Sequence, residues 1–238
     1  MLTEFPNTSK QIWQYLSNKQ LNNYAIAGLI GNMYCESSLN PQNLQNSYNK
    51  SLKVSDEAYT QAVDRGKYTK FATDKAGYGL CQWTNSSRKQ NLLDYAKQQS
   101  ASVGDLNTQL DFLYNELSHS YLSVLKALQT VTSVKEASDI ILTKFERPAN
   151  QTEENKKFRA DICKQFYNKF AEKEHNTKMV DKIKDNTPDP WAKEAVEWAV
   201  ENHILYGDNN GDYKLHKDCT RQEMIVFLDR VRKLNGGK

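Results

Sequence analysis

Apolar residues recur at helical spacing over residues 22–36, and the Asn40-Pro41 pair ends this pattern. A proline excludes helical backbone angles at the residue before it, so the pair predicts a helix stop. Leu29 and Met33 precede Glu36 by seven and three residues, and the three side chains therefore share one helix face. The chain has to fold so that an apolar helix face carries a carboxylate in its last turns.

Two effects favour the protonated form of Glu36. Burial against an apolar face disfavours the anion, and so does the negative end of the helix dipole. A carboxylic acid that keeps its proton near neutral pH can act as a general acid and protonate a leaving oxygen. A solvated glutamate on a fraying last turn has the same local sequence, so the helix pattern by itself leaves both interpretations open.

The first three quarters of the chain are patterned as a helical domain. Helices are predicted over 8–18, 22–36, 86–99, 105–118, 134–146 and 153–171. The stretch KYTKFATDKAGYGLCQWT, residues 67–84, differs because it is aromatic, β-branched and interrupted by glycines, and it predicts a short hairpin or a strand leading into a turn. We therefore expect an α+β fold that is predominantly helical, with one small β element.

The composition changes after residue 173. Residues 174–188 are polar and charged and end near two prolines, which is typical of a linker between domains. A second module is predicted over 189–238, with a helix that begins at Pro190, a glycine- and aspartate-rich loop, and a last helix from Thr220. The first domain is then 1–173.

Charge and cysteine usage exclude several classes of protein. A net charge of +3, without a basic cluster interleaved with aromatic residues, gives no reason to expect nucleic-acid binding. The start of the chain lacks a basic segment followed by an apolar one, so we expect synthesis in the cytoplasm without a signal peptide. The four cysteines lack C-x-x-C spacing, which favours reduced, buried thiols over a Cys35–Cys81 disulfide, and four dispersed histidines predict no structural metal site.

Three motifs occur in one order: AIAGLIGNMYCESSLNP, GYGLCQWT and FERPAN. Together they resemble the lysozyme superfamily, in which a helix-terminal Glu-Ser precedes a β element with an aromatic-Gly pair. The resemblance is closer to the phage lysozymes of tail tips, tail knobs and endolysins, and it covers roughly residues 10–171. It implies a lysozyme-like catalytic domain that needs no cofactor and takes bacterial peptidoglycan as its substrate.

The resemblance assigns roles to individual residues. Glu36 is the expected catalytic acid, and the β element with Gly79 is expected to form the floor of a cleft opposite it. Gln82 and Thr84 can hydrogen-bond sugar hydroxyls and amides, while Tyr78 and Trp83 either stack on sugar rings or pack in the core. In FERPAN, Glu146 and Arg147 either pair with each other at a helix end, or one of them lines the substrate groove. The substrate-binding residues expected are Tyr78, Gln82, Thr84 and Arg147.

A second catalytic carboxylate is missing from its usual place. In animal-type lysozymes it precedes the aromatic-Gly pair, and here that position is Gly77. Asp74 is the nearest substitute and is assigned to the catalytic site. Further candidates lie in a predicted loop that crosses the same region; they are Asp56, Glu57 and Asp64. The gap also resembles goose-type lysozymes and lytic transglycosylases, which rely mainly on one glutamate. A cysteine nucleophile, Cys35 or Cys81 with His119, is a remote alternative.

The second module, residues 189–234, resembles one S-layer homology repeat, apart from His203 where that pattern has glycine. Such repeats bind secondary cell-wall polysaccharides, and the resemblance singles out Arg221, with Asp189 and Trp191 as companions. Thr220 and Glu223 form a capping-box pattern that needs no ligand. We expect the tryptophans at 191 and 198 to pack against Met224, Phe227 and Leu228. Because these repeats usually come in threes, a homo-oligomer through this module is a further expectation.

The sequence as a whole predicts a phage or prophage lysin of a Gram-positive host. It would cleave the β-1,4 bond between N-acetylmuramic acid and N-acetylglucosamine, with Glu36 as the acid, and reach the wall after a holin opens the membrane. The alternatives are a lytic transglycosylase that uses the same glutamate, and a non-enzymatic wall-binding or phage structural protein.

Overall fold

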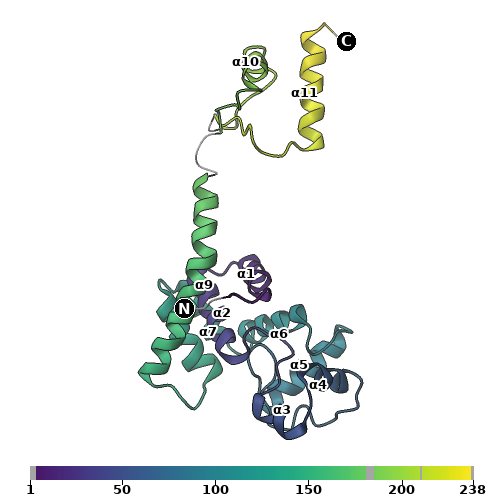
Figure 1. Ribbon diagram of the computed structural model, residues 1–238, viewed down its shortest axis with the longest axis vertical. Helices are drawn as coiled ribbons and strands as arrows, with labels where there is room; N and C mark the ends of the chain where they lie inside the picture. The colour runs from purple at the N-terminus through teal and green to yellow at the C-terminus, as the bar shows by residue number, and fades with distance from the viewer. Residues whose placement is uncertain (1–3, 181–184, 210, 237–238) are drawn as a thin grey trace. The chain divides into compact units, whose positions relative to one another are not determined.

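The computed structural model describes residues 4–180, 185–209 and 211–236 (Figure 1). The chain divides into two compact units, residues 1–173 and 174–238, and each is treated by itself. In the part of the chain that the structure describes, no helix combines the length and the apolar character needed to cross a membrane.

The first unit is built from helices, as the sequence patterns predict. All six predicted helices form, although the one expected over 134–146 divides into an α-helix and a π-helical turn. Three short helices, α3, α4 and α7, were not predicted, because seven to nine residues give too little periodicity to recognise. The elements are α1 (Thr8–Asn18), α2 (Asn23–Ser37), α3 (Asn46–Leu52), α4 (Asp56–Asp64), α5 (Ser86–Gln98), α6 (Leu106–Ser118), α7 (Leu122–Thr130), α8 (Val134–Ile140), η1 (Ile141–Glu146) and α9 (Glu153–Val180).

Helix α2 is the centre of this unit. It packs against α1, α8 and η1, and most of its residues are buried. Two glycines allow this close packing: a Cβ on Gly28 would lie 2.7 Å from the Ala137 Cβ, and a Cβ on Gly31 would lie 2.6 Å from the Cys163 Cα. Helix α9 therefore approaches α2 closely enough for side chains of α9 to reach the end of α2 that carries Glu36.

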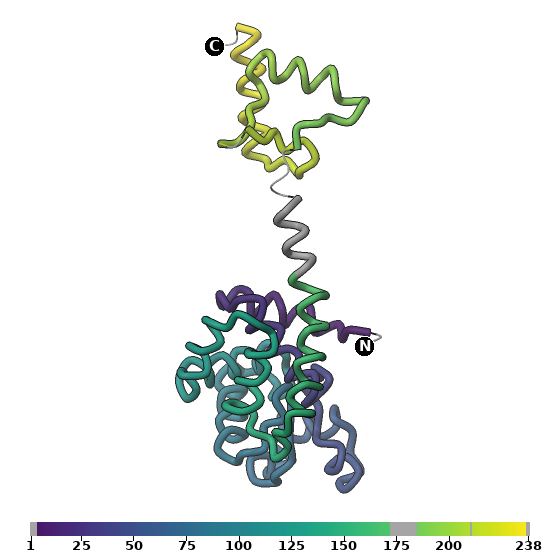
Figure 2. Tube along the Cα trace, turned by 90° about the vertical axis from the view of Figure 1, so that its left-hand side faces the viewer, coloured from purple at the N-terminus to yellow at the C-terminus, as the bar shows by residue number. Residues whose placement is uncertain are grey.

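Helix α9 also holds the start of the chain (Figure 2). The N-terminal segment lies beside α9, where the Phe5 ring meets the Phe166 ring edge-on at 5.1 Å. Trp13 of α1 stacks on Phe170 at 5.3 Å. These contacts fix α9 against the α1–α2 pair.

The β element predicted over 67–84, a short hairpin or a strand leading into a turn, does not form a strand. No strand is found among the described residues; this segment forms turns with two isolated antiparallel bridges, Leu44 to Tyr78 and Tyr78 to Trp83. Gly79 has a φ of +74°, which turns the chain sharply. Tyr78 and Trp83 exchange backbone hydrogen bonds, and the N–H of Leu80 in the turn between them donates to the Gln109 side chain at 2.9 Å.

The second unit contains α10 (Lys193–Glu201) and α11 (Arg221–Leu234). Helix α9 continues to Val180, so the first seven residues of the expected linker 174–188 are helical, and residues 181–184 lie outside the described residues. Helix α10 begins three residues after Pro190, because residues 190–192 form a turn. The capping box of Thr220 and Glu223 is confirmed.

The expected packing of the two tryptophans is wrong. Trp191 is 86% exposed and Trp198 is 49% exposed, while Met224 and Leu228 are also exposed. Among the described residues of this unit, only Ile204 and Asp212 are buried. Several apolar side chains of α10 and α11 therefore stay exposed in the described part of this unit.

Candidate active site

Glu36 lies in the last turn of α2, which ends at Ser37, one residue after the predicted range 22–36. The helix stops at Ser37 because Ser38 and Leu39 adopt left-handed backbone angles, with φ of 54° and 60°. The Ser37 hydroxyl lies 3.0 Å from the Leu80 carbonyl oxygen. This contact brings the Glu-Ser motif and the GYGLCQ segment together, as the resemblance implied.

A buried arginine lies between two glutamates. Arg159 of α9 donates from Nη2 to Glu36 Oε1 at 2.6 Å and from Nη1 to Glu146 Oε2 at 2.8 Å. The Glu36 side chain is 20% exposed, whereas those of Arg159 and Glu146 are 9% and 5% exposed. Asn32 supports the arginine with its Oδ1 atom, 3.2 Å from Nη1. We call Glu36, Arg159 and Glu146 the acid cluster; Glu36 is its most exposed member.

The acid cluster contains two carboxyls and one guanidinium. Burial and the nearby Glu36 carboxylate raise the pKa of Glu146 above its usual range, against the opposing effect of Arg159. The site therefore favours the protonated form of Glu146.

Glu146 and Arg147 do not pair with each other. Glu146 ends η1 and turns inward to Arg159, while Arg147 takes a left-handed conformation with φ of 52° and is exposed. FERPAN thus contributes one residue to the acid cluster and another to the surface beside it.

Asp74 has a structural role instead of a catalytic one. Its carboxylate is 5% exposed and accepts hydrogen bonds from Lys89 Nζ at 2.6 Å and the Tyr59 hydroxyl at 2.6 Å. The Tyr68 hydroxyl and the Ala76 N–H complete its partners. A carboxylate with all its partners inside the protein is not available to a sugar. The other candidates, Asp56, Glu57 and Asp64, lie on α4 and not in a loop.

Most of the predicted substrate-binding residues have structural contacts. Tyr78 is fully buried and hydrogen-bonded to Thr60, and Trp83 is 1% exposed with its Nε1 donating to Glu116. Neither ring provides a stacking surface. Gln82 is half-buried and uses its Nε2 to hold the Asn43 backbone and side chain. Thr84 is exposed, and its hydroxyl donates to a backbone carbonyl.

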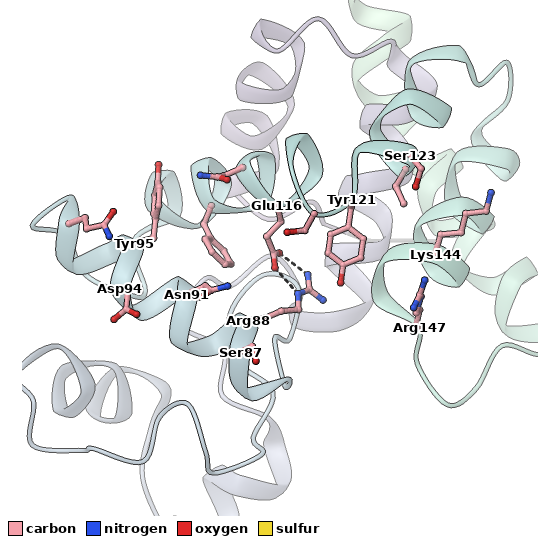
Figure 3. Close-up of a pocket in the computed structure, with 15 residues that line it drawn as sticks. Ser87, Arg88, Asn91, Asp94, Tyr95, Glu116, Tyr121, Ser123, Lys144 and Arg147 are labelled. Atoms are coloured by element: carbon pink, nitrogen blue, oxygen red, sulfur yellow. Dashed lines mark hydrogen bonds and ion pairs between the residues drawn. The ribbon is translucent and has the colours of Figure 1, made fainter.

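Beside the acid cluster lies a groove of about 860 Å³ (Figure 3). Arg88 forms a bidentate ion pair with Glu116 on its floor, and its charge also acts on Glu146. Glu36 is not among the residues that line this groove, but Arg147 is. The other lining residues that Figure 3 labels are Ser87, Asn91, Asp94, Tyr95, Tyr121, Ser123 and Lys144.

The cysteines do not form a nucleophilic site. Cys81 and Cys163 are buried, Cys35 is half-buried and Cys219 is exposed; all four are free thiols. Burial raises the pKa of Cys35 to about 11, so its thiolate is disfavoured. His119 is exposed, and its Nδ1 lies 2.9 Å from the Asn115 carbonyl oxygen. No cluster of metal-ligating side chains is found within the described ranges.

In the second unit, Trp191, Arg221 and Asp189 are all exposed. Asp189 lies 3.5 Å from His216 Nε2. Within the residues described for this unit, no hydrogen bond or ion pair joins the three predicted wall-binding residues to one another. The structure therefore does not assemble them into a site.

The first unit is a lysozyme-like helical domain. The last turn of its central helix carries a glutamate, and the next residue, Ser37, contacts the turn at Leu80. The sequence model of the phage tail lysozyme family matches residues 7–170, more than half of the 238 residues. The chain therefore belongs to the phage tail lysozyme family, and its lysozyme-like activity is directed at peptidoglycan.

Arg159 is the site residue that the sequence interpretation missed. It precedes Ile162 and Cys163, two buried residues of α9, by three and four positions. It thus lies on the apolar face of its helix, as Glu36 does on α2. A charged residue on an apolar helix face was the signal that identified Glu36, and the same signal could have identified Arg159.

Proposed function

We propose that the first unit is an N-acetylmuramidase that cleaves the β-1,4 bond between N-acetylmuramic acid and N-acetylglucosamine, with Glu36 as the general acid. The observation that supports it best is the partly exposed Glu36 carboxyl at the edge of a buried acid cluster. It has access to a substrate, while the burial of its neighbours lets the cluster keep a proton for the leaving oxygen.

The assignment of Asp74 to the protein interior favours a mechanism with one substrate-facing carboxyl. Water can then complete the reaction, as the resemblance to goose-type lysozymes implies. The alternative is a lytic transglycosylase, in which the 6-hydroxyl of the substrate attacks and leaves an anhydro sugar.

Mass spectrometry of purified Gram-positive peptidoglycan after digestion tests this proposal. A muramidase gives new reducing muramic-acid ends. Products lighter by one water, with anhydro ends, would establish a transglycosylase instead. Binding without any cleavage would contradict both and leave a wall-binding protein.

For the second unit, we propose a role in binding anionic secondary cell-wall polysaccharide. The support is the resemblance to one S-layer homology repeat and the exposed Arg221, whose guanidinium suits a carboxylated sugar. We expect Arg221→Ala to weaken co-sedimentation with Gram-positive walls several-fold without changing the hydrolysis of soluble fragments. Arg232→Ala, a change to an arginine of the same helix that pairs with Asp229, is the control. Equal binding by both variants and the wild type would contradict the role of Arg221.

We also propose that this unit assembles copies of the chain. Its exposed apolar residues include Trp191, Ile225 and Leu228, and burying them between copies would remove apolar surface from water. Light scattering of the intact protein is expected to give a mass above the monomer, and Leu228→Glu to return it to 27.4 kDa. A strict monomer for the wild type at working concentration would exclude assembly.

These activities fit a lysin of a Gram-positive phage or prophage that is made in the host cytoplasm and reaches the wall after a holin opens the membrane. Fractionation of infected or induced cells before and after holin triggering tests this location.

A further inference from the structure

We propose that Glu146 is a positioning residue that holds the catalytic proton for Glu36, so that the two carboxyls share one proton across Arg159. This inference rests on the proposed function of Glu36 and deepens it. It gives a role to the FERPAN glutamate, and it replaces the second carboxylate that was expected near Gly77.

The geometry of the acid cluster is the first support. One guanidinium contacts both carboxyls, at 2.6 Å and 2.8 Å. Two buried anions facing one cation would leave one negative charge uncompensated in a low-dielectric site, which is strongly unfavourable. Retention of one proton by the pair removes that charge.

The unequal burial of the two glutamates is the second support. Glu146, at 5% side-chain exposure, is the more costly place for an anion and the better place for the proton in the free enzyme. Glu36, at 20% exposure, is the carboxyl of the pair that a substrate can reach. A bound glycan would exclude water from Glu36 and favour transfer of the proton to it.

The proton that the pair gives to the substrate is returned within one turnover. The O–H bond of Glu146 breaks, its proton moves to a Glu36 oxygen, and the new Glu146 carboxylate pairs with Arg159 Nη1. Glu36 then gives the proton to the glycosidic oxygen, which takes the electron pair of the breaking C–O bond. The attacking water supplies the oxygen at the anomeric carbon and returns one proton to the pair.

Other titratable groups face the pair and bear on its pH dependence. Arg88 of α5 lowers the proton affinity of Glu146, and Glu116 of α6 neutralises Arg88. Glu146 also interacts electrostatically with three thiols. Burial raises the pKa values of these thiols, so they stay protonated at neutral pH; they are Cys35, Cys81 and Cys163. Arg88 and the three thiols therefore keep their charge states at neutral pH, and the pair is left as the group that can exchange a proton.

The pH profile of peptidoglycan cleavage tests the proposal with Glu146→Gln. This variant removes the buried carboxyl that holds the shared proton, while the Arg159 guanidinium remains. We expect the alkaline limb to move down by about one to two pH units, with activity recovered on acidification. Glu146→Asp keeps a carboxyl and should restore much of the wild-type profile.

Asp74→Asn is the matched control. It also removes a buried carboxylate from an ion pair, with Lys89, but lies outside the acid cluster. It is expected to lower stability and to leave the shape of the pH profile unchanged. The same alkaline limb in Glu146→Gln as in the wild type would overturn the proposal.

Infrared spectroscopy keeps the proposal testable if Glu146→Gln does not fold. The wild type at neutral pH should show the carbonyl band of a protonated carboxyl. This band should be lost in Glu36→Gln, because Glu146 then pairs with Arg159 alone and ionises. Persistence of the band in Glu36→Gln would overturn proton sharing. This readout needs no substrate, so it separates failure of this inference from failure of the muramidase proposal.

Discussion

Replacement of Glu36 by glutamine is expected to abolish the release of muropeptides, with a loss of about 10²–10⁴-fold in the cleavage rate. The amide has no proton to give to the leaving oxygen. The fold should persist, because the amide oxygen of glutamine can still accept from Arg159 Nη2 where Glu36 Oε1 does now, at 2.6 Å. The rate is measured by mass spectrometry of digested peptidoglycan, with circular dichroism to check the fold.

A matched control separates the acid from a general change of charge. Glu154→Gln removes an exposed glutamate in the first turn of α9, away from the acid cluster, and should leave the rate unchanged. Cleavage by Glu36→Gln at the wild-type rate would exclude Glu36 as the acid. The groove lined by Arg88 and Arg147 would then be the next candidate for the catalytic site.

Replacement of Arg159 by methionine is expected to cause the largest loss of stability, about 3–5 kcal/mol in the free energy of unfolding. Methionine fills most of the space of the arginine stem but leaves two carboxyls facing each other without a cation. The loss should be greater at neutral pH than at acid pH, because the pair with one shared proton keeps one buried negative charge without a cation, and acidification removes that charge. Urea unfolding at both pH values measures the difference.

The control for this prediction is Lys156→Met, which removes a cation of the same helix that pairs on the surface with Glu153. A surface pair in water contributes little, so the unfolding midpoint should stay close to that of the wild type. Equal unfolding curves for the two variants would show that Arg159 does not hold the acid cluster together.

The sequence by itself determined the features that depend on local periodicity and local chemistry. The helical character of the first unit, the six longer helices and the capping box at Thr220 each follow from residues close together in the chain. The placement of Glu36 at the end of a buried helix also follows from a local pattern. The order of three motifs was enough to indicate the lysozyme family, which the match over residues 7–170 confirms.

Only the tertiary structure decided what each polar side chain contacts. Asp74 and Glu146 are both acidic residues near a recognisable motif, but one binds Lys89 in the core and the other meets Glu36 across Arg159. Residue 159 is 123 positions from residue 36, and no local pattern specifies such a contact. The β element predicted at 67–84 is limited to one backbone pair, Tyr78 and Trp83, and a distant side chain, Gln109, binds the turn between them. Charge pairing and hydrogen bonding between distant segments depend on how α2, η1 and α9 pack, and that packing is a property of the whole fold.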